Sequence, residues 1–199
     1  MDSTRLHVKL GRFDSIRLLE LTRSGPGDPI QGCLIQSRLD ETPKYSALSY
    51  VWGDPSPSDP ILHVNGSQFR IRKSLFQALD HLLSDVTTMA MWIDQICIDQ
   101  ENDAEREQQV KLMSRIFTQA QRVICWLGLH DKDSEYAFDL LHILVTNTPN
   151  PKASSDWERA ANKLWTAGYL KDLSNMFDPT MVPFSAVAAL ANRPWFSML

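Results

Sequence analysis

A pair of apolar runs with a helix between them restricts the fold of this chain more than any other feature. The run MAMWIDQICI, residues 89–98, predicts a strand covered on both faces, with its polar residues toward its C-terminal end. The run RVICWLG, residues 122–128, predicts a second buried strand. A strand, a helix and a strand joined by short connections form a right-handed crossover between parallel strands. The core is therefore predicted to be α/β.

The helix between these runs is predicted to begin after Asn102. Asn102 and Glu105 have the spacing of a capping box, in which Glu105 supplies the inward-reaching carboxylate. Glu107 and Lys111 lie four residues apart and can pair on the solvent side. One apolar face recurs at helical spacing and consists of Val110, Met113, Ile116, Phe117 and Ala120.

Two hairpins and a further strand are predicted upstream. Residues 16–21 and 30–39 are extended runs that flank the turn-rich stretch SGPGD, as in an antiparallel hairpin. A strand is expected at residues 45–51. The dipeptide Asn65-Gly66 separates two more extended runs and predicts a type I′ turn, because both of its central positions need positive φ.

A helix is predicted to follow the second hairpin, because Ser74 and Gln77 form a capping box before a run of apolar residues at helical spacing. Beyond Gly128, helical stretches are expected around residues 134–145, 155–166 and 185–192. The chain, residues 1–199, is interpreted as a single domain with an α/β core at 16–128 and a helical extension at 129–199.

Composition excludes several classes of protein. The net charge of −4 and the scattered Lys and Arg residues give no support to a nucleic-acid partner. The N-terminal residues lack the apolar core of a secretory signal, and no stretch is long enough to span a bilayer, so a soluble, cytoplasmic protein is expected. The 3 cysteines form no CxxC pair, which indicates reduced thiols and no structural metal.

Polar residues gather where two predicted strands end. Ligands of parallel α/β sheets bind outside the carboxyl ends of the strands, so Trp52, Gly53, Asp54 and the stretch that begins at Asp94 are candidates for a cleft. Trp52 could stack on a planar group, Gly53 could let the backbone approach a ligand, and Asp54 could accept hydrogen bonds from hydroxyls. The competing structural interpretation, which the residues alone favour, places Trp52 in the core, Gly53 in a turn and Asp54 at a loop cap.

Three further residues have both a chemical and a structural interpretation. Asp94 lies inside an apolar run, where an ionised carboxylate needs a partner or a functional role. Cys97 could be a nucleophile only beside a base, and no histidine motif supplies one, so a buried inert thiol is favoured. Glu105 is a catalytic candidate or the carboxylate of its capping box. No GxGxxG, GxxxxGK[ST], HExxH or GxSxG motif occurs.

Four segments together carry a family resemblance. YSALSYVWGD, the VNG turn, WIDQICIDQENDAEREQQVKLMSRIFTQAQRVICWLG and RPWF resemble the fungal heterokaryon-incompatibility (HET) domain family, from about Ile16 to the C-terminus. The resemblance implies an intracellular fungal protein of non-self recognition and regulated cell death, with this domain as the death-inducing part.

HET domains are in turn similar to Toll/interleukin-receptor (TIR) domains. This resemblance implies a TIR-like, flavodoxin-like parallel-sheet core with N-terminal β-hairpins and a C-terminal helical annex. Some TIR domains hydrolyse NAD at the nicotinamide–ribose bond with a glutamate that stabilises positive charge on the ribose. By this resemblance the chain would be an NAD glycohydrolase with NAD as substrate, and its nucleotide cleft would be lined by Tyr50, Trp52, Gly53, Asp54, Asp94, Gln95 and Cys97.

One departure from the family pattern concerns the catalytic acid. The family continues past RPWF with a tryptophan-rich segment that ends in Gln-Glu, whereas this chain stops at Leu199, so the expected catalytic glutamate segment is missing. Three alternatives follow: a truncated form, an acid supplied from elsewhere, for which Asp94, Glu105 or Glu158 are candidates, or a form without chemistry. In the last case the domain is a non-catalytic signalling module that binds a protein partner or a second copy of itself.

Overall fold

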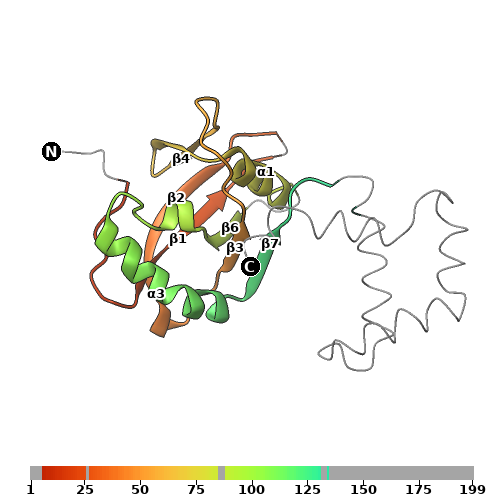
Figure 1. Ribbon diagram of the computed structural model, residues 1–199. Coiled ribbons are helices and arrows are strands. Elements are labelled where there is room, and N and C mark those ends of the chain that lie inside the picture. Colours follow the sequence, from red (N-terminus) through yellow and green to blue (C-terminus); the bar gives the residue numbers. More distant parts are fainter. Residues whose placement is uncertain (1–5, 26, 85–87, 131–133, 135–199) are drawn as a thin grey trace, which may run out of the picture. The chain divides into compact units, whose positions relative to one another are not determined.

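The computed structural model describes residues 6–25, 27–84, 88–130 and 134 (Figure 1). The chain divides into two compact units, Met1–Gly128 and Leu129–Leu199, and the account below concerns the first. The helical annex predicted for residues 129–199 lies almost wholly outside the described residues, so it stays a prediction.

In the described part of the chain, seven strands form one mixed sheet in the order β5-β4-β2-β1-β6-β3-β7. The strands are β1 (Ser15–Thr22), β2 (Gln31–Arg38), β3 (Ser46–Tyr50), β4 (Ile61–Val64), β5 (Ser67–Arg70), β6 (Thr88–Trp92) and β7 (Arg122–Trp126). The predicted α/β class is confirmed. Strands β6, β3 and β7 form a parallel core, β1 pairs antiparallel with both β2 and β6, and β2 pairs parallel with β4. The sheet is therefore mixed, where the sequence predicted a parallel-sheet core preceded by this hairpin.

The parallel strands are crossed by helices on opposite faces of the sheet. The helical segments are η1 (Leu39–Glu41), α1 (Lys73–Leu82), α2 (Asp94–Cys97) and α3 (Asp103–Gln119). Trp92 of β6 meets Phe117 of α3 edge to face at 5.7 Å between ring centroids. Trp126 of β7 meets His81 of α1 at 5.6 Å. Trp92 is in register with Ala47 of β3, and Trp126 is in register with Tyr50 of the same strand. Ala47 and Tyr50 are an odd number of residues apart, so their side chains, and those of the two tryptophans, lie on opposite faces of the sheet.

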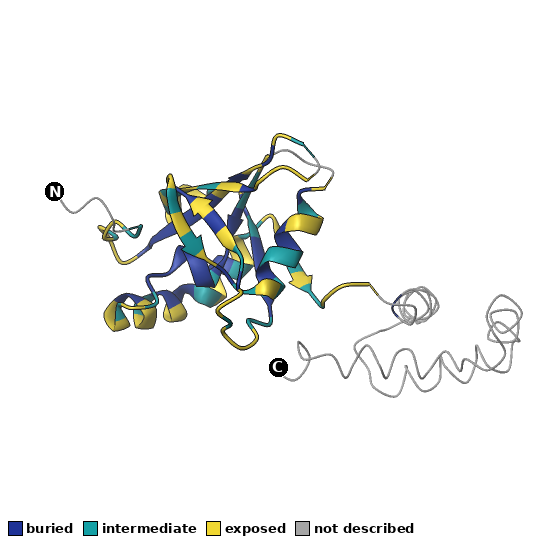
Figure 2. Ribbon diagram, turned by 90° about the horizontal axis from the view of Figure 1, so that it is seen from above, coloured by how far each residue is buried: buried dark blue, intermediate teal, exposed yellow. Residues whose placement is uncertain are grey.

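The core consists of the sheet interior and the inner sides of the helices. Figure 2 shows buried strands at the centre and exposed residues on the outer side of α3. Trp92, Leu19, Leu48 and Leu79 are almost completely buried. Burial of side chains of this size stabilises a fold by about 1.5–3 kcal/mol each.

Both predicted hairpins are present. Strands β1 and β2 pair from Ser15–Arg38 to Thr22–Gln31. Asn65 and Gly66 connect β4 to β5 with φ of 52° and 75°, as a type I′ turn requires.

The capping box predicted at Ser74 is wrong. Helix α1 begins after Arg72 without a side-chain cap. The hydroxyl of Ser74 instead donates hydrogen bonds to the carbonyl oxygens of Val51, at 2.6 Å, and Trp52, at 3.0 Å. Ser74 therefore holds the segment that follows β3 in place.

The apolar run at residues 89–98 is two elements. Strand β6 ends at Trp92, and α2 begins at Asp94, where the carboxylate accepts a hydrogen bond from the backbone N–H of Gln95 at 2.7 Å. Ile96 and Cys97 are fully buried in this short helix. The periodicity of apolar residues could not separate the two elements, because a helix buried on all sides is as apolar as a buried strand.

Helix α3 packs on the core through most of the predicted face, since Ile116 is fully buried and Met113, Phe117 and Ala120 pack against the core. Its buried residues are Glu105, Gln109, Leu112 and Ile116, whereas Val110 is 54% exposed. The prediction was wrong for Val110 alone. The apolar pattern did not indicate that Glu105 and Gln109 also lie on the buried side, where they bind Arg17 and the Ser15 carbonyl oxygen. Strand β7 is likewise less buried than predicted, because it is an edge strand among the described residues.

Substitution of Gly66 tests the turn. Gly66→Ala is expected to lower the free energy of unfolding by roughly 1 kcal/mol, because Ala is strained at positive φ although a Cβ would meet no atom within 4 Å there. Gly11→Ala is the matched control, since a Cβ at Gly11 also meets nothing within 4 Å and no positive φ is imposed. Urea denaturation measures both, and an equal loss in the two variants would contradict the assignment of strain to the turn.

Candidate functional site

The carboxyl ends of β3 and β6 are joined by a hydrogen-bonded pair. The indole Nε1–H of Trp52 donates to both carboxylate oxygens of Asp94, at 3.1 Å to Oδ1 and 3.0 Å to Oδ2. Two residues that the sequence placed at separate strand ends therefore meet. The polar groups proposed to face a ligand are bound to each other in this structure.

Gln95 makes the second connection between the same segments. Its Oε1 accepts hydrogen bonds from the hydroxyl of Tyr50, at 3.1 Å, and from the backbone N–H of Arg72, at 3.4 Å. The side chain of Gln100 donates to the carbonyl oxygen of Asp94 at 2.8 Å. The ends of β3 and β6 and the start of α1 thus form one polar cluster, which we call the strand-end cluster: Tyr50, Trp52, Arg72, Asp94 and Gln95.

The electrostatics of the strand-end cluster are set by burial. Burial raises the pKa of Asp94 above its ordinary value of 3.8, although the hydrogen bonds from the Gln95 N–H and the Trp52 indole act to lower it. Burial also raises the pKa of the Tyr50 hydroxyl, with the nearby Asp94 charge acting in the same direction. Both groups are thereby held toward their neutral forms, and Tyr50 remains a donor.

The other predicted cleft residues have separate positions. Gly53 has a φ of 72° and open space at its Cβ position, so this left-handed backbone conformation favours glycine. Asp54 is exposed on the loop that follows. Cys97 is fully buried; burial raises the pKa of its thiol to about 12, and its sulfur accepts a hydrogen bond from the Ile93 N–H at 3.3 Å. A nucleophilic cysteine requires the thiolate, which this environment disfavours.

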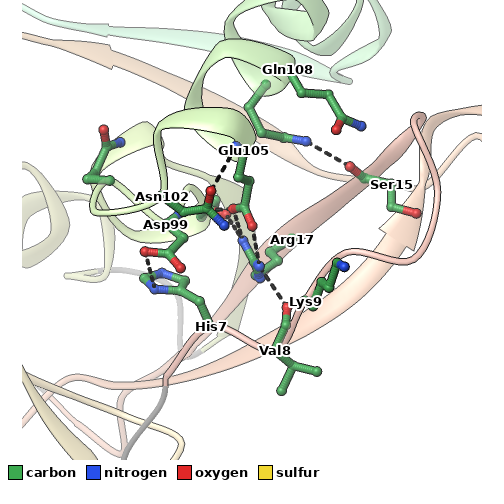
Figure 3. A network of polar contacts seen from close by, with 12 residues as sticks. His7, Val8, Lys9, Ser15, Arg17, Asp99, Asn102, Glu105 and Gln108 are labelled. Carbon is green, nitrogen blue, oxygen red and sulfur yellow. Dashed lines mark hydrogen bonds and ion pairs between the residues drawn. The ribbon is translucent and has the colours of Figure 1, made fainter.

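Glu105 is bound by Arg17 in a buried ion pair (Figure 3). The Arg17 guanidinium donates to Oε1 at 2.5 Å and to Oε2 at 3.0 Å, and the backbone N–H of Asp99 donates to Oε1 at 2.9 Å. Asn102 caps α3 through Oδ1 as predicted, by accepting from the Glu105 N–H at 3.3 Å. The predicted capping-box role of the Glu105 carboxylate is wrong, because Arg17 and Asp99 take up its oxygens.

Arg17 and His7 are site residues that sequence reasoning missed. Arg17, 2% exposed, also donates to the carbonyl oxygens of Cys97, at 3.0 Å, and Val8, at 2.7 Å. His7 Nε2 lies 2.8 Å from the carbonyl oxygen of Ile96, and Nδ1 lies 3.9 Å from Asp99 Oδ1. A signal for Arg17 existed, since a charged side chain in the apolar strand IRLLEL raises the same question as Asp94. No comparable signal marked His7.

Burial and pairing act in opposite directions on the pKa of Glu105. Burial tends to raise it, but the Arg17 hydrogen bonds, the Asp99 N–H and the Arg17 charge together outweigh burial and place the pKa below the ordinary value of 4.5. Glu105 therefore stays ionised, whereas Asp94 is pushed toward its acid form.

A pocket of about 330 Å³ opens beside α2. Its lining residues are Leu6, His7, Ser67, Gln68, Phe69, Gln95, Ile98, Asp99, Gln100 and Glu101. Gln95 connects this pocket to the strand-end cluster, whereas Trp52, Asp54 and Asp94 are absent from its lining. The described residues hold no group of three or more His, Cys, Asp and Glu side chains arranged to bind a metal ion. Among them, too, no helix has the length and apolar character needed to cross a bilayer.

Comparisons with known proteins point in one direction. The family model described as "Heterokaryon incompatibility protein (HET)" matches residues 45–197. "Heterokaryon incompatibility protein 6, OR allele" of Neurospora crassa is 37% identical over 139 residues, which are 63% of this chain and 20% of that protein. The chain thus spans about a fifth of the length of this relative. No solved structure matches it.

The raised pKa of Asp94 gives a pH-dependent expectation. A carboxyl that binds its proton more tightly in the folded state stabilises the fold most below its unfolded pKa, near 3.8, and this contribution is lost as pH rises through the folded pKa. Asp94→Asn lacks the titration. The stability of the native chain relative to Asp94→Asn should therefore decrease as pH rises above about 3.8, as measured by urea denaturation.

Trp52→Phe provides the control for this titration. It removes an N–H that lowers the pKa of Asp94, so the decrease should extend to higher pH in a Trp52→Phe background. A difference between the native chain and Asp94→Asn that is constant across this range would contradict the assignment.

The Arg17–Glu105 pair should respond differently to single and double substitution. Glu105→Gln is expected to cost about 3–5 kcal/mol, because it leaves a buried guanidinium without its counter-charge. The double variant Arg17→Met/Glu105→Met should lose less than the two single variants together, since no charge stays buried.

Two controls accompany these substitutions. Glu107→Gln, which breaks an exposed pair with Lys111 on the same helix, should change stability little. Because the pKa of Glu105 is lowered, its contribution is present above about pH 4.5 and lost as pH falls, so the deficit of Glu105→Gln should shrink in acid. An equal deficit at acid and neutral pH would refute the ionised pair.

Proposed function

Because the chain belongs to the heterokaryon incompatibility (HET) family, we propose that it acts in fungal non-self recognition as the module that triggers regulated cell death. The name of the Neurospora crassa relative supports the first part of this proposal. Cytoplasmic action fits the 3 cysteines, which are all free thiols in the structure.

The geometry favours a signalling module that acts by protein–protein contact. The observation that carries this conclusion is the Trp52–Asp94 pair, whose polar atoms bind each other and leave no carboxylate there poised toward a substrate. Glu105 is committed to Arg17 in the same way. These bonds fix the strand ends, and the exposed loop that carries Gly53 and Asp54 extends from this fixed base. A rigid base that presents a loop is suited to binding a partner or a second copy.

NAD cleavage is the second candidate, and strand order supports it. Numbered along the chain, the parallel strands lie in the order second, first, third, which is the order at the start of flavodoxin-like sheets. The carboxyl ends of the first two carry Tyr50, the last residue of β3, and are followed by Trp52, Asp94 and Gln95, at the edge where such folds bind nucleotides. A TIR-like relationship would give this edge a nucleotide, although the candidate Glu105 is bound by Arg17.

Two substitutions separate the fixed base from the proposed contact loop. Trp52→Phe should lower the free energy of unfolding by about 2 kcal/mol, because it removes the donor to a buried carboxylate. Asp54→Ala should leave thermal stability unchanged and weaken concentration-dependent assembly, measured by light scattering after size-exclusion chromatography. In either variant, any loss of assembly should be accompanied by a loss of toxicity on expression in a fungal host. A chain that stays monomeric at all concentrations and is still toxic would refute the assembly proposal.

Incubation with NAD distinguishes the two candidates. A signalling module is expected to release no nicotinamide above the uncatalysed rate, as followed by chromatography, whether the chain ends at Leu199 or is extended by the family's C-terminal segment. Release by either form that is lost in Asp94→Asn would favour NAD cleavage and overturn the non-catalytic proposal.

A further inference from the structure

The pocket beside α2 has the size of a site for one side chain or small ligand. Its volume of about 330 Å³ lies at the lower end of the range for ligand pockets, roughly 300–1,000 Å³. Leu6, Phe69 and Ile98 form its apolar part, and Phe69 contacts the His7 ring edge to face at 6.3 Å between centroids. The walls therefore combine an aromatic surface with polar groups.

Gln95 lines this pocket and has a side-chain hydrogen-bond donor without a partner among the described residues. Its side chain is 7% exposed, and its Oε1 is identified by the Arg72 backbone N–H, which can only donate. The amide Nε2 therefore occupies the other position, where it makes no hydrogen bond to any described residue. This nitrogen is not one of the fully enclosed polar atoms without a partner, and Gln95 is a lining residue of the pocket. A ligand at this position must offer an acceptor.

The charge of the pocket is negative. Asp99 and Glu101 contribute carboxylates, His7 is the one group in the lining that can carry positive charge, and the lining includes no Lys or Arg. The sum stays negative whether or not His7 is protonated. Glu101 is exposed at the mouth, so its charge acts on an approaching ligand. Such a site repels phosphates and carboxylates and attracts cations.

We propose that this pocket binds an arginine or lysine side chain of a protein partner. The cationic head lies near Glu101 and Asp99, its stem packs on Phe69 with a cation–π contribution, and a backbone carbonyl of the partner accepts the hydrogen bond from Gln95 Nε2. This inference rests on the proposed role as a protein-binding module and names the chemistry of its partner.

The test uses the whole chain and a minimal ligand. The ¹⁵N-labelled protein is titrated by NMR with N-acetyl-arginine amide, and the side-chain amide signals of Gln95 are followed. Saturable shifts at Gln95 and at the backbone of Phe69 and Glu101 are expected. N-acetyl-glutamate amide and N-acetyl-norleucine amide, which replace the positive charge by a negative one or by none, should bind more weakly.

Charge variants make the test specific. Glu101→Gln should weaken binding of the arginine amide about fivefold, as expected for loss of one charge about 4 Å away in water, and Glu101→Lys should weaken it further. Glu107→Gln is the matched control, because Glu107 is an exposed glutamate outside the pocket. Equal affinity for the norleucine amide, unshifted Gln95 signals, or unchanged affinity in Glu101→Gln would each overturn the inference.

Failure here is distinguishable from failure of the proposed function. A toxic, self-assembling protein that does not bind the arginine amide would remove the pocket inference alone. Binding of the amide by a chain that neither assembles nor kills would leave the pocket in place and remove the proposed function.

Discussion

The buried guanidinium of Arg17 is the contact on which the arrangement of the site depends. It reaches from β1 to the Glu105 carboxylate of α3, the Cys97 carbonyl of α2 and the Val8 carbonyl of the N-terminal segment. A charge at this depth is tolerated only when its partners are complete, so α3 must begin in the register that brings Glu105 to it. Together with the Asn102 cap, this fixes the turn between α2 and α3, and hence the position from which Gln95 faces the pocket.

Two acids of this region illustrate how partners decide the outcome of burial. Glu105 meets a full positive charge and remains an anion, whereas Asp94 meets the dipoles of an indole and an amide, which do not fully compensate for lost hydration. One acid therefore favours the fold when ionised and the other when protonated. The same polar contacts hold the strand ends rigid, and rigidity suits a surface that recognises another molecule without reorganising.

Local signals predicted local structure well. The Asn65-Gly66 turn, the Asn102 cap, the Glu107–Lys111 pair and the strand at β3 follow from neighbouring residues alone, and each is present. Contacts between residues far apart in the sequence were not predicted. Glu105 has the spacing of a capping box, but the residue that claims it lies 88 positions away.

The candidate site, too, was predicted where it depends on strand positions and missed where it depends on long-range contacts. The meeting of Trp52 and Asp94 could be anticipated because parallel strands end at one edge, but their direct hydrogen bonds could not, since no sequence rule says whether two polar groups face a ligand or each other. The pocket could not be predicted from the sequence, because Leu6 and His7, which line it, belong to a segment without any periodic pattern.

The position of β1 shows that the folded sheet includes residues outside the segment matched by the family model. The family match begins at residue 45, yet β1 lies between β2 and β6, hydrogen-bonded to both. A chain that began at Tyr45 would lack β1 and β2, so one edge of β6 would be exposed and β4 would lose its pairing with β2. The buried Glu105 carboxylate would also lose its ion pair with Arg17. Open strand edges recruit other chains indiscriminately. Self-association in such a shortened protein would therefore report a missing strand and say nothing about recognition.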